Sequence, residues 1–532
     1  MLMRKVKVFD TTLRDGAQGA GISFSAEDKL KIAAALDSFG ISYIEGGWPG
    51  SNPKDEEFFK LAKSKKNKLK NSKLVAFTST RKPKTNIEED NSIKKVVESG
   101  VKTVTVFGKS WDLHVKYALK TTKQENLSMI FDTVSFFKNK KFEVIYDAEH
   151  YFDGYIHNKK YAIETIKKAA DAGADYICLC ETNGGVLPEY IEKIVKETIN
   201  EFPSLKFGIH AHNDCECAVA NSIIAVQAGC KMVQGTINGI GERCGNANLC
   251  SIIPSLQLKG KYHCVPVRNL KNITELSRYV DEIANLVPIP SMAYVGSAAF
   301  AHKAGVHVSA VEKKSTTYEH INPKHVGNKR RILVSDLSGK SNIISKADEL
   351  AINLEKQSGN FKGIIDIVKN KEHNGYQYEN ADGSLFILTK KVEKKYKDFF
   401  TLKSYRVSVE KNKDGSIVSE ATVKLDVNGK EEHTVAEGEG PVNALDKCLR
   451  KALIKFYPEI KTVLLTDFKV RVINSDANTA AKVRVLIETK DKKHTWGTIG
   501  VSENIIDACW QALSDSVEYK LLKFNNIGGK NG

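Results

Sequence analysis

The sequence contains no long apolar segment, although 41% of its 532 residues are hydrophobic. A membrane-spanning helix needs about 20 consecutive apolar residues, and no segment approaches that length. The first residues, MLMRKVKVFD, pass from a few basic side chains directly into a strand-like segment and lack the apolar core of a secretory signal. We therefore expect a cytoplasmic protein with no membrane partner.

Cysteine pairs of the kind that bind metals or form redox motifs are also missing. None of the 10 cysteines belongs to a C-x-x-C pair. Cys178, Cys180, Cys215 and Cys217 instead alternate within apolar segments, so we expect them to be buried, reduced thiols.

Positive charge is abundant but not concentrated. The net charge is +16, yet 64 acidic residues are interleaved with the 80 lysines and arginines. Nucleic-acid-binding proteins gather basic side chains on one face, whereas a lysine-rich stretch such as 60–73 is typical of a solvated surface. No nucleic-acid partner is expected.

The first 260 or so residues alternate β-branched segments with amphipathic helical stretches, which predicts a parallel sheet built of βα units. Eight units in that length are typical of a (β/α)₈ TIM barrel. Ser25, Asp28 and Gly40 fit the N-cap, the capping-box position and the C-terminal glycine of the first helix. The predicted strands are 5–10, 41–47, 73–79, 101–108, 142–149, 174–182, 205–212 and 231–237.

A chain of 532 residues is too long for one hydrophobic core, so further domains are expected after the barrel. We assign residues 1–265 to the barrel and 266–392 to helical linker subdomains that carry a histidine-rich segment. From about 395 the hydrophobic period changes to two, and 395–525 resembles two copies of a unit of three strands and one helix. The fold class is thus α/β, with a C-terminal α+β domain over 393–532 that contains a βββα repeat.

Polar residues collect where the predicted barrel strands end, which is the end that carries the active site in TIM-barrel enzymes. They are Arg14, Asp15, Glu45, Glu149, Glu181, Thr182, His210, His212, Asn213, Glu242, Arg243 and Asn246.

Four of these residues suggest a metal site. His210 and His212 are two apart on a strand, so their side chains share one face and could bind one divalent cation, with Asp15 as an anionic ligand. Histidines on strands are more often structural, but an aspartate and the amide of Asn246 at the same rim favour the metal. Zinc, manganese and magnesium all fit such ligands.

A metal beside Arg14 and Thr182 suits a 2-oxo acid, whose ketone and carboxylate can chelate the cation while the arginine and the hydroxyl bind the carboxylate. Forming a carbon–carbon bond also requires a group that handles the methyl proton of the incoming acyl group. Glu149 is one candidate, and the alternative is a structural ion pair at the end of its strand.

Four motifs, FDTTLRDGAQ, HAHND, GTINGIGERCGN and FAHKAGVH, together resemble the 2-isopropylmalate, homocitrate and citramalate synthase family over nearly the whole chain. The resemblance implies metal ligands, oxo-acid-binding residues, and acid/base residues with an assisting tyrosine. The implied metal ligands are Asp15, His210, His212 and Asn246, and the implied oxo-acid-binding residues are Arg14 and Thr182. The implied acid/base residues are Glu149 and His307, and the assisting tyrosine is Tyr318.

Within this family, the segment 21–55 is more similar to citramalate synthases. Its Glu45-Gly46-Gly47-Trp48-Pro49 stands where isopropylmalate and homocitrate synthases commonly have an EVGFP-like sequence. The resemblance therefore implies that acetyl-CoA and pyruvate give (R)-citramalate and CoA. The alternatives are 2-isopropylmalate synthesis from 2-oxoisovalerate, a lyase, and a non-enzymatic amino-acid-binding regulator.

The resemblance also implies that 393–532 is an allosteric, LeuA-like dimerisation domain of a homodimer, with isoleucine as the expected feedback inhibitor. GEGPVNA (438–444) and GVSENII (500–506) each precede a predicted helix. The backbone N–H groups of a helix N-terminus could bind the carboxylate of an amino acid, although these glycines could equally serve only the turns before the helices.

Overall fold

The computed structural model describes residues 4–64, 68–335, 338–349, 361–392, 396, 398–473 and 481–528. The chain divides into two compact units, and we describe each by itself. One comprises Met1–Phe300 with Ile321–Lys329, and the other comprises Ala301–His320 with Arg330–Gly532. Among the described residues, no helix combines the length and the apolar character needed to cross a membrane.

The first unit contains a closed barrel of parallel strands, in which each strand pairs with the next in the chain and β9 returns to β2. Every strand predicted from the sequence overlaps one of these, and the predicted barrel is confirmed. The strands are β2 (Lys7–Asp10), β3 (Tyr43–Gly47), β4 (Lys73–Ser79), β5 (Thr103–Lys109), β6 (Glu143–Glu149), β7 (Tyr176–Glu181), β8 (Phe207–Ala211) and β9 (Met232–Gly235).

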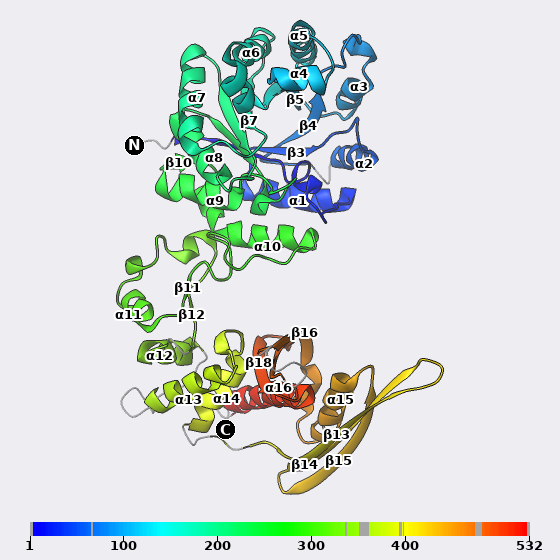
Figure 1. The fold of residues 1–532 in the computed structure, drawn as a ribbon, viewed down its shortest axis with the longest axis vertical. Helices are drawn as coiled ribbons and strands as arrows, with labels where there is room; N and C mark the ends of the chain where they lie inside the picture. The colour runs from blue at the N-terminus through cyan, green and yellow to red at the C-terminus, as the bar shows by residue number, and fades with distance from the viewer. Residues whose placement is uncertain are drawn as a thin grey trace. The chain divides into compact units, whose positions relative to one another are not determined.

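Figure 1 shows helices around the strands of the barrel. The first helix has the predicted ends: Ser25 and Asp28 form a capping box, and Gly40 ends the helix in the left-handed conformation. The helices are α1 (Ala26–Phe39), α2 (Pro53–Ala62), α3 (Asn91–Glu98), α4 (Asp112–Tyr117), α5 (Lys123–Asn139), α6 (Tyr151–Asp171), α7 (Pro188–Glu201), α8 (Ala218–Ala228) and α9 (Leu249–Pro254).

The barrel strands are buried on both faces, as parallel strands covered by helices usually are. One apolar cluster fills the barrel interior and includes Phe9, Ile145 and Met232, and a larger one lies between strands and helices. The strand ends that carry polar residues are thus held by packing from both sides.

The prediction of buried cysteines is half right. Cys178 and Cys180 are buried on β7, but Cys215 is exposed and Cys217 is partly exposed. The reason is that β8 ends at Ala211 and α8 begins at Ala218, so both residues lie in the connecting loop.

The first compact unit continues beyond residue 265. Helix α10 (Ile273–Ile283) packs against α1 and against the short helix η4 (Ile237–Gly239) that follows β9. A short pair of strands, β1 (Arg4–Lys5) and β10 (Tyr262–His263), joins the beginning of the chain to the segment before α10.

The second unit begins with the short parallel strands β11 (Ala301–His302) and β12 (Arg331–Ile332) and with four helices. Residues 350–360 of the predicted helical linker lie outside the described residues. The helices are α11 (Gly305–Lys313), α12 (Lys340–Glu349), α13 (Phe361–His373) and α14 (Asp382–Val392).

The predicted βββα repeat is confirmed. Each copy is a three-stranded antiparallel sheet followed by a helix, and buried residues of both copies share one apolar cluster. The elements are β13 (Thr401–Lys411), β14 (Ile417–Val427), β15 (Lys430–Gly438), α15 (Pro441–Leu453), β16 (Leu464–Val472), β17 (Val483–Lys490), β18 (Thr495–Ser502) and α16 (Ile505–Gly528).

Candidate active site

A cavity of about 400 Å³ lies at the carboxyl ends of the barrel strands. It brings together most of the site residues predicted within the barrel. Those lining it are Arg14, Asp15, Glu149, Thr182, His210 and His212.

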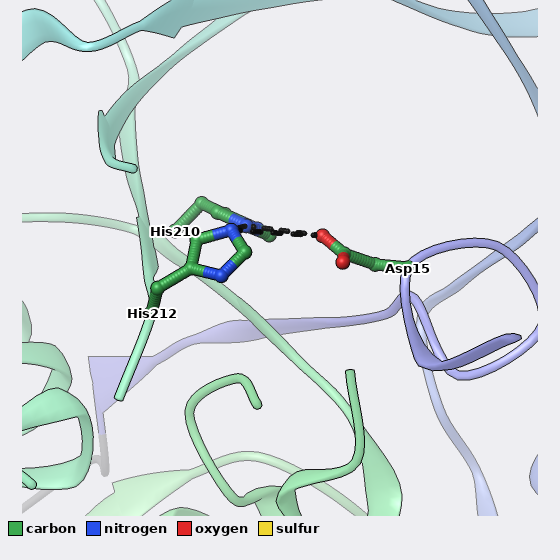
Figure 2. Close-up of side chains that lie close together, drawn as sticks. All are labelled: Asp15, His210 and His212. Carbon is green, nitrogen blue, oxygen red and sulfur yellow. Dashed lines mark hydrogen bonds and ion pairs between the residues drawn. The ribbon is translucent and has the colours of Figure 1, made fainter. Parts of the chain in front are cut away.

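Asp15, His210 and His212 converge on one point of this cavity (Figure 2). Asp15 follows β2 in a tight turn in which the N–H groups of Arg14 and Gly16 both donate to the carbonyl of Thr11. One carboxylate oxygen, Oδ2, lies 3.4 Å from Nε2 of His210 and 3.9 Å from Nε2 of His212. The two Nε2 atoms are 3.2 Å apart.

The protonation states of Asp15 and His212 follow from burial and from the neighbouring charges. Burial opposes ionisation of Asp15, but Arg14 and His210 outweigh it and hold the pKa of the carboxyl well below its usual range. Burial and the nearby His210 lower the pKa of His212 to about 3, so this imidazole is neutral at physiological pH. Asp15 thus presents an anionic oxygen and His212 a neutral nitrogen, which are the forms that bind metals.

The donor atoms in the structure fit a divalent cation. One ligand atom from each of the three residues lies within 4.8 Å of the other two. Two imidazole nitrogens that face each other at 3.2 Å need a proton or a cation between their lone pairs. Oδ1 of Asp15 and both amide atoms of Asn246 are buried without a hydrogen-bond partner among the residues that the structure describes. Asn246 is paired with His212 through an isolated β-bridge. Unpaired buried polar atoms are costly, and a bound cation would satisfy oxygens among them.

Arg14 is held rigidly beside this trio. Its Nε donates to Oε2 of Glu45 at 2.7 Å, and its Nη1 lies 3.1 Å from Oδ2 of Asp15. The guanidinium carbon also lies 4.0 Å from the centre of the Phe77 ring. These contacts fix the plane of the guanidinium, which suits it to bind a planar carboxylate in one orientation.

An aromatic wall, formed by Trp48, Phe77 and Phe107, lines the cavity next to Arg14. The two phenylalanine rings stack with centroids 5.0 Å apart, and Trp48 packs edge-on against both. The backbone N–H of Trp48 donates to Oδ2 of Asp55 at 2.8 Å. A Cβ at Gly47 would come within 2.4 Å of the Asp55 carboxylate, so the glycine before Trp48 is required for this close approach.

Glu149 and Thr182 lie on the neighbouring strand ends. Glu149, the last residue of β6, forms an ion pair with Lys109 at the end of β5. The hydroxyl of Thr182 accepts a hydrogen bond of 2.9 Å from the backbone N–H of His150, and the Thr182 carbonyl accepts one of 2.7 Å from Arg243. Both side chains line the cavity with their backbones fixed by adjacent strands.

His307 and Tyr318 belong to the second compact unit. His307 lies on α11, and its ring centroid is 4.1 Å from that of Tyr318. Both side chains are exposed to solvent, so this pair is open to a ligand or to another surface.

Sequence reasoning overlooked two polar residues of the barrel interior, Asp147 and Gln234. Asp147 precedes Glu149 by two residues on β6, and alternation along a strand puts both on the inner face. Gln234 is a fully buried amide on β9. The period of two could have indicated Asp147, whereas only the barrel geometry reveals the partners of Gln234.

Three family models match successive parts of the chain. The HMGL-like model covers residues 5–280, the homocitrate synthase post-HMGL domain-like model covers 294–375, and the LeuA allosteric (dimerisation) domain covers 379–521. The first of these spans more than half of the chain and contains the barrel and its cavity.

Curated relatives match nearly end to end. The (R)-citramalate synthase of Aquifex aeolicus is 55% identical over 99% of this chain and 100% of its own length, and that of Geobacter sulfurreducens is 53% identical over 99% of both. The 2-isopropylmalate synthase of Methanocaldococcus jannaschii is 31% identical over 98% of this chain and 95% of its own. The chain therefore belongs to the citramalate synthase branch of the HMGL-like family, and it is an enzyme.

Proposed function

We propose that this enzyme condenses acetyl-CoA with pyruvate and water to give (R)-citramalate and free CoA. The observation that carries the proposal is the cavity in which Asp15, His210 and His212 lie beside Arg14 and Glu149. The new bond joins the acetyl methyl carbon to the ketone carbon of pyruvate. Hydrolysis of the thioester then releases CoA and makes the reaction effectively irreversible.

Asp15, His210 and His212 would hold a zinc, manganese or magnesium ion, with Asn246 as a further oxygen donor. A bound cation would polarise the ketone of the 2-oxo acid and stabilise the negative charge that develops on its oxygen. Arg14, fixed by Glu45 and Phe77, binds the carboxylate of pyruvate, and the Thr182 hydroxyl adds a further hydrogen bond.

Glu149 handles the proton of the acetyl methyl group, and Lys109 compensates its charge. His307 and Tyr318 supply the second acid/base group and its assisting hydroxyl, in keeping with their ring contact at 4.1 Å. In this scheme one carboxylate removes a proton from carbon while the histidine returns a proton to the alkoxide oxygen.

We expect pyruvate to be the preferred 2-oxo acid. The aromatic wall stands next to Arg14, so we expect less room there for the branched side chain of 2-oxoisovalerate than for the methyl group of pyruvate. A difference of a single methylene can change kcat/KM by about 10- to 200-fold. Thiol release should be measured with acetyl-CoA, a divalent metal and a panel of 2-oxo acids, and with the oxo acid omitted as the control for plain thioester hydrolysis. A higher kcat/KM with 2-oxoisovalerate than with pyruvate would favour isopropylmalate synthesis instead.

We further propose that isoleucine inhibits by binding at the N-terminus of α15. The N-cap residue Gly440 offers no side chain to the first N–H groups of this helix, whereas Asn504 caps α16 by accepting from the N–H of Ile506 at 2.9 Å. A Cβ at Gly440 would meet no atom of the described residues within 4 Å, but one at Gly438 would meet the backbone of Ala444 at 2.4 Å. Gly440 is therefore the position at which a substitution tests the site without disturbing the fold.

Gly440→Asp should raise the isoleucine concentration for half-inhibition by about tenfold or more and leave kcat unchanged. The new carboxylate would accept hydrogen bonds from the free N–H groups of the helix and would repel the carboxylate of isoleucine. Isoleucine would then lose one charge-assisted hydrogen bond to the protein. Gly440→Ala is the matched control and should be inhibited normally. Inhibition by leucine alone would favour isopropylmalate synthesis, and no inhibition by any amino acid would leave this domain a packing role only.

We also propose a homodimer formed through the C-terminal domain. Strand β16 exposes a row of large apolar side chains that a monomer would leave in water: Leu464, Leu465, Phe468, Val470 and Val472. Exposed apolar rows of this kind usually mark association surfaces. Light scattering should give twice the chain mass, and Phe468→Glu with Val470→Glu should shift it toward the monomer. A monomeric starting protein at working concentration would refute the proposal.

A further inference from the structure

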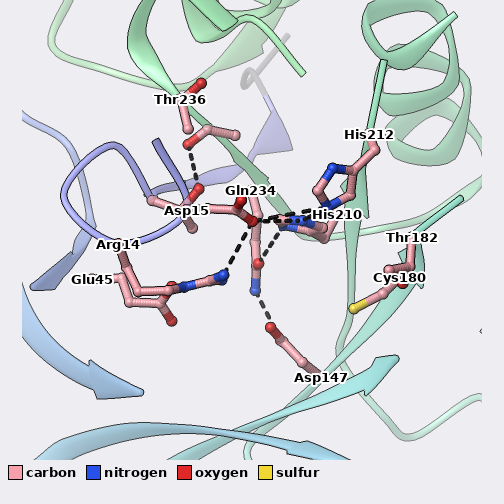
Figure 3. A network of polar contacts seen from close by, with 12 residues as sticks. Arg14, Asp15, Glu45, Asp147, Cys180, Thr182, His210, His212, Gln234 and Thr236 are labelled. Atoms are coloured by element: carbon pink, nitrogen blue, oxygen red, sulfur yellow. Dashed lines mark hydrogen bonds and ion pairs between the residues drawn. The ribbon is translucent and has the colours of Figure 1, made fainter. Parts of the chain in front are cut away.

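A chain of buried hydrogen bonds runs from His210 across the inside of the barrel (Figure 3). Nδ1 of His210 lies 3.0 Å from Oε1 of Gln234, and Nε2 of Gln234 donates to Oδ1 of Asp147 at 3.0 Å. The exposed fractions of His210, Gln234 and Asp147 are 5%, 0% and 4%, so the interactions among them are shielded from solvent. We call this chain the Asp147–Gln234 relay.

The chemistry of the relay allows only one arrangement of protons when Asp147 is ionised. A carboxylate accepts hydrogen bonds and donates none, so Gln234 must direct its NH₂ group toward Asp147. The amide oxygen then faces His210 and accepts a hydrogen bond from the N–H at Nδ1. His210 is thereby held in the tautomer whose Nε2 carries a free lone pair, on the side of Asp15 and His212.

A rotated amide would have the opposite effect. With its NH₂ group toward His210, Gln234 would need an unprotonated Nδ1, and the neutral ring would carry its proton on Nε2, where a metal must bind. Gln234 is fully buried, so no solvent contact favours either orientation. The acceptor at the far end, Asp147, therefore decides which face of the amide meets the histidine.

The closed barrel brings Asp147, His210 and Gln234 together, although they lie on three different strands. Asp147 is on β6, His210 on β8 and Gln234 on β9, and β7 and β8 separate β6 from β9 in the sheet order. Gln234 thus spans the interior of the barrel. Metal-bound histidines commonly donate their second ring nitrogen to a carboxylate or carbonyl, and loss of that partner weakens metal binding by about 10- to 100-fold.

We propose that Asp147 and Gln234 are positioning residues that fix the tautomer of His210 and so prepare its Nε2 to bind the metal. The inference rests on the proposed metal site and adds the residues that control one of its ligands. A merely structural relay would fill space and satisfy buried polar groups without regard to which partner donates. The two roles differ in how they respond to an exchange of donor and acceptor along the relay.

Mn²⁺ affinity, measured as free Mn²⁺ by electron paramagnetic resonance, separates these roles without any assay of turnover. Asp147→Asn removes the obligatory acceptor and lets the amide of Gln234 rotate. Gln234→Glu keeps an acceptor for His210 but sets a second carboxylate against Asp147. Asp147→Asn should weaken Mn²⁺ binding by about 10- to 100-fold, because the acceptor for Nδ1 of His210 is no longer fixed. Gln234→Glu keeps that acceptor and should weaken binding less, through the contact of two carboxylates alone.

The double variant Asp147→Asn with Gln234→Glu restores the original order of donors and acceptors. The asparagine placed at position 147 donates, and the glutamate at position 234 accepts from both the asparagine and Nδ1 of His210. Its affinity for Mn²⁺ should return close to that of the starting protein. Measurements at about pH 8 keep Asp147 ionised, because burial raises its pKa to about 7.

Asn221→Asp is the matched control, since Asn221 is a fully buried amide of the same unit that donates to the carbonyl of Val186 and does not line the cavity. Its Mn²⁺ affinity should be unchanged. Unaltered binding in Asp147→Asn, or a double variant as weak as Asp147→Asn, would overturn the relay as a tautomer lock. A starting protein that binds no Mn²⁺, Zn²⁺ or Mg²⁺ would instead overturn the proposed metal site, and with it this inference.

Discussion

Replacing His210 or His212 with alanine should abolish turnover and remove the bound metal. Each variant loses one of the three donor groups that lie within 4.8 Å of one another. A Lewis acid supplies several kcal/mol of charge stabilisation in the transition state, so its loss should lower kcat by on the order of a thousandfold or more. Thiol release and metal content by atomic absorption should be measured on the same preparations.

His494→Ala is a matched control, because this histidine lies in the C-terminal domain with its side chain 65% exposed. The control should keep both the metal and the activity. Near-normal turnover in both His210→Ala and His212→Ala would end the metal hypothesis. Loss of activity with full metal content would mean that these imidazoles act in some way other than as ligands.

Replacing Glu149 with glutamine should lower kcat by about 10²- to 10⁴-fold while the metal content stays unchanged. Glutamine has nearly the same shape but cannot accept the methyl proton, and Glu149 is not one of the three grouped donor residues. Its ion pair with Lys109 holds the carboxylate at the edge of the cavity. The pair of measurements, kcat and metal content, separates proton transfer from metal binding.

The same strand offers a control at its other end. Glu143 begins β6, where it accepts from the hydroxyl of Tyr43 at 2.9 Å and from Lys73 at 2.7 Å. Glu143→Gln should therefore leave kcat of the folded enzyme unchanged. An equal loss of kcat in both variants would indicate general damage to the barrel, and an unchanged kcat in Glu149→Gln would make Glu149 a structural residue.

The sequence predicted the barrel well because its signals are local. Each strand is a short β-branched segment, and the capping box of Ser25 and Asp28 marks the start of the first helix within four residues. The spacing of His210 and His212 likewise indicates a shared face, since alternation along a strand is a property of the backbone. These features need no knowledge of the partners that surround them.

The relay and the aromatic wall could not be predicted in the same way. Gln234 contacts Asp147 across 87 positions of sequence, and the wall combines residues from three different strand ends. Such contacts depend on strand order and on the exact side-chain reach inside the closed barrel. The exposure of Cys215 and Cys217 could not be predicted either. Their apolar neighbours suggested a buried strand, but β8 ends at Ala211 and both residues lie in the loop that follows.

The closure of the barrel has a consequence for how the protein matures. Asp15 follows the first barrel strand and His210 lies on the seventh, so the donor groups come together only when β2 has met β9. A nascent chain that ends before His210 has no such site. Once a cation binds the completed site, it stabilises the closed form by mass action, because the unfolded chain binds it poorly. Metal supply would then act on the folding yield as well as on the chemistry.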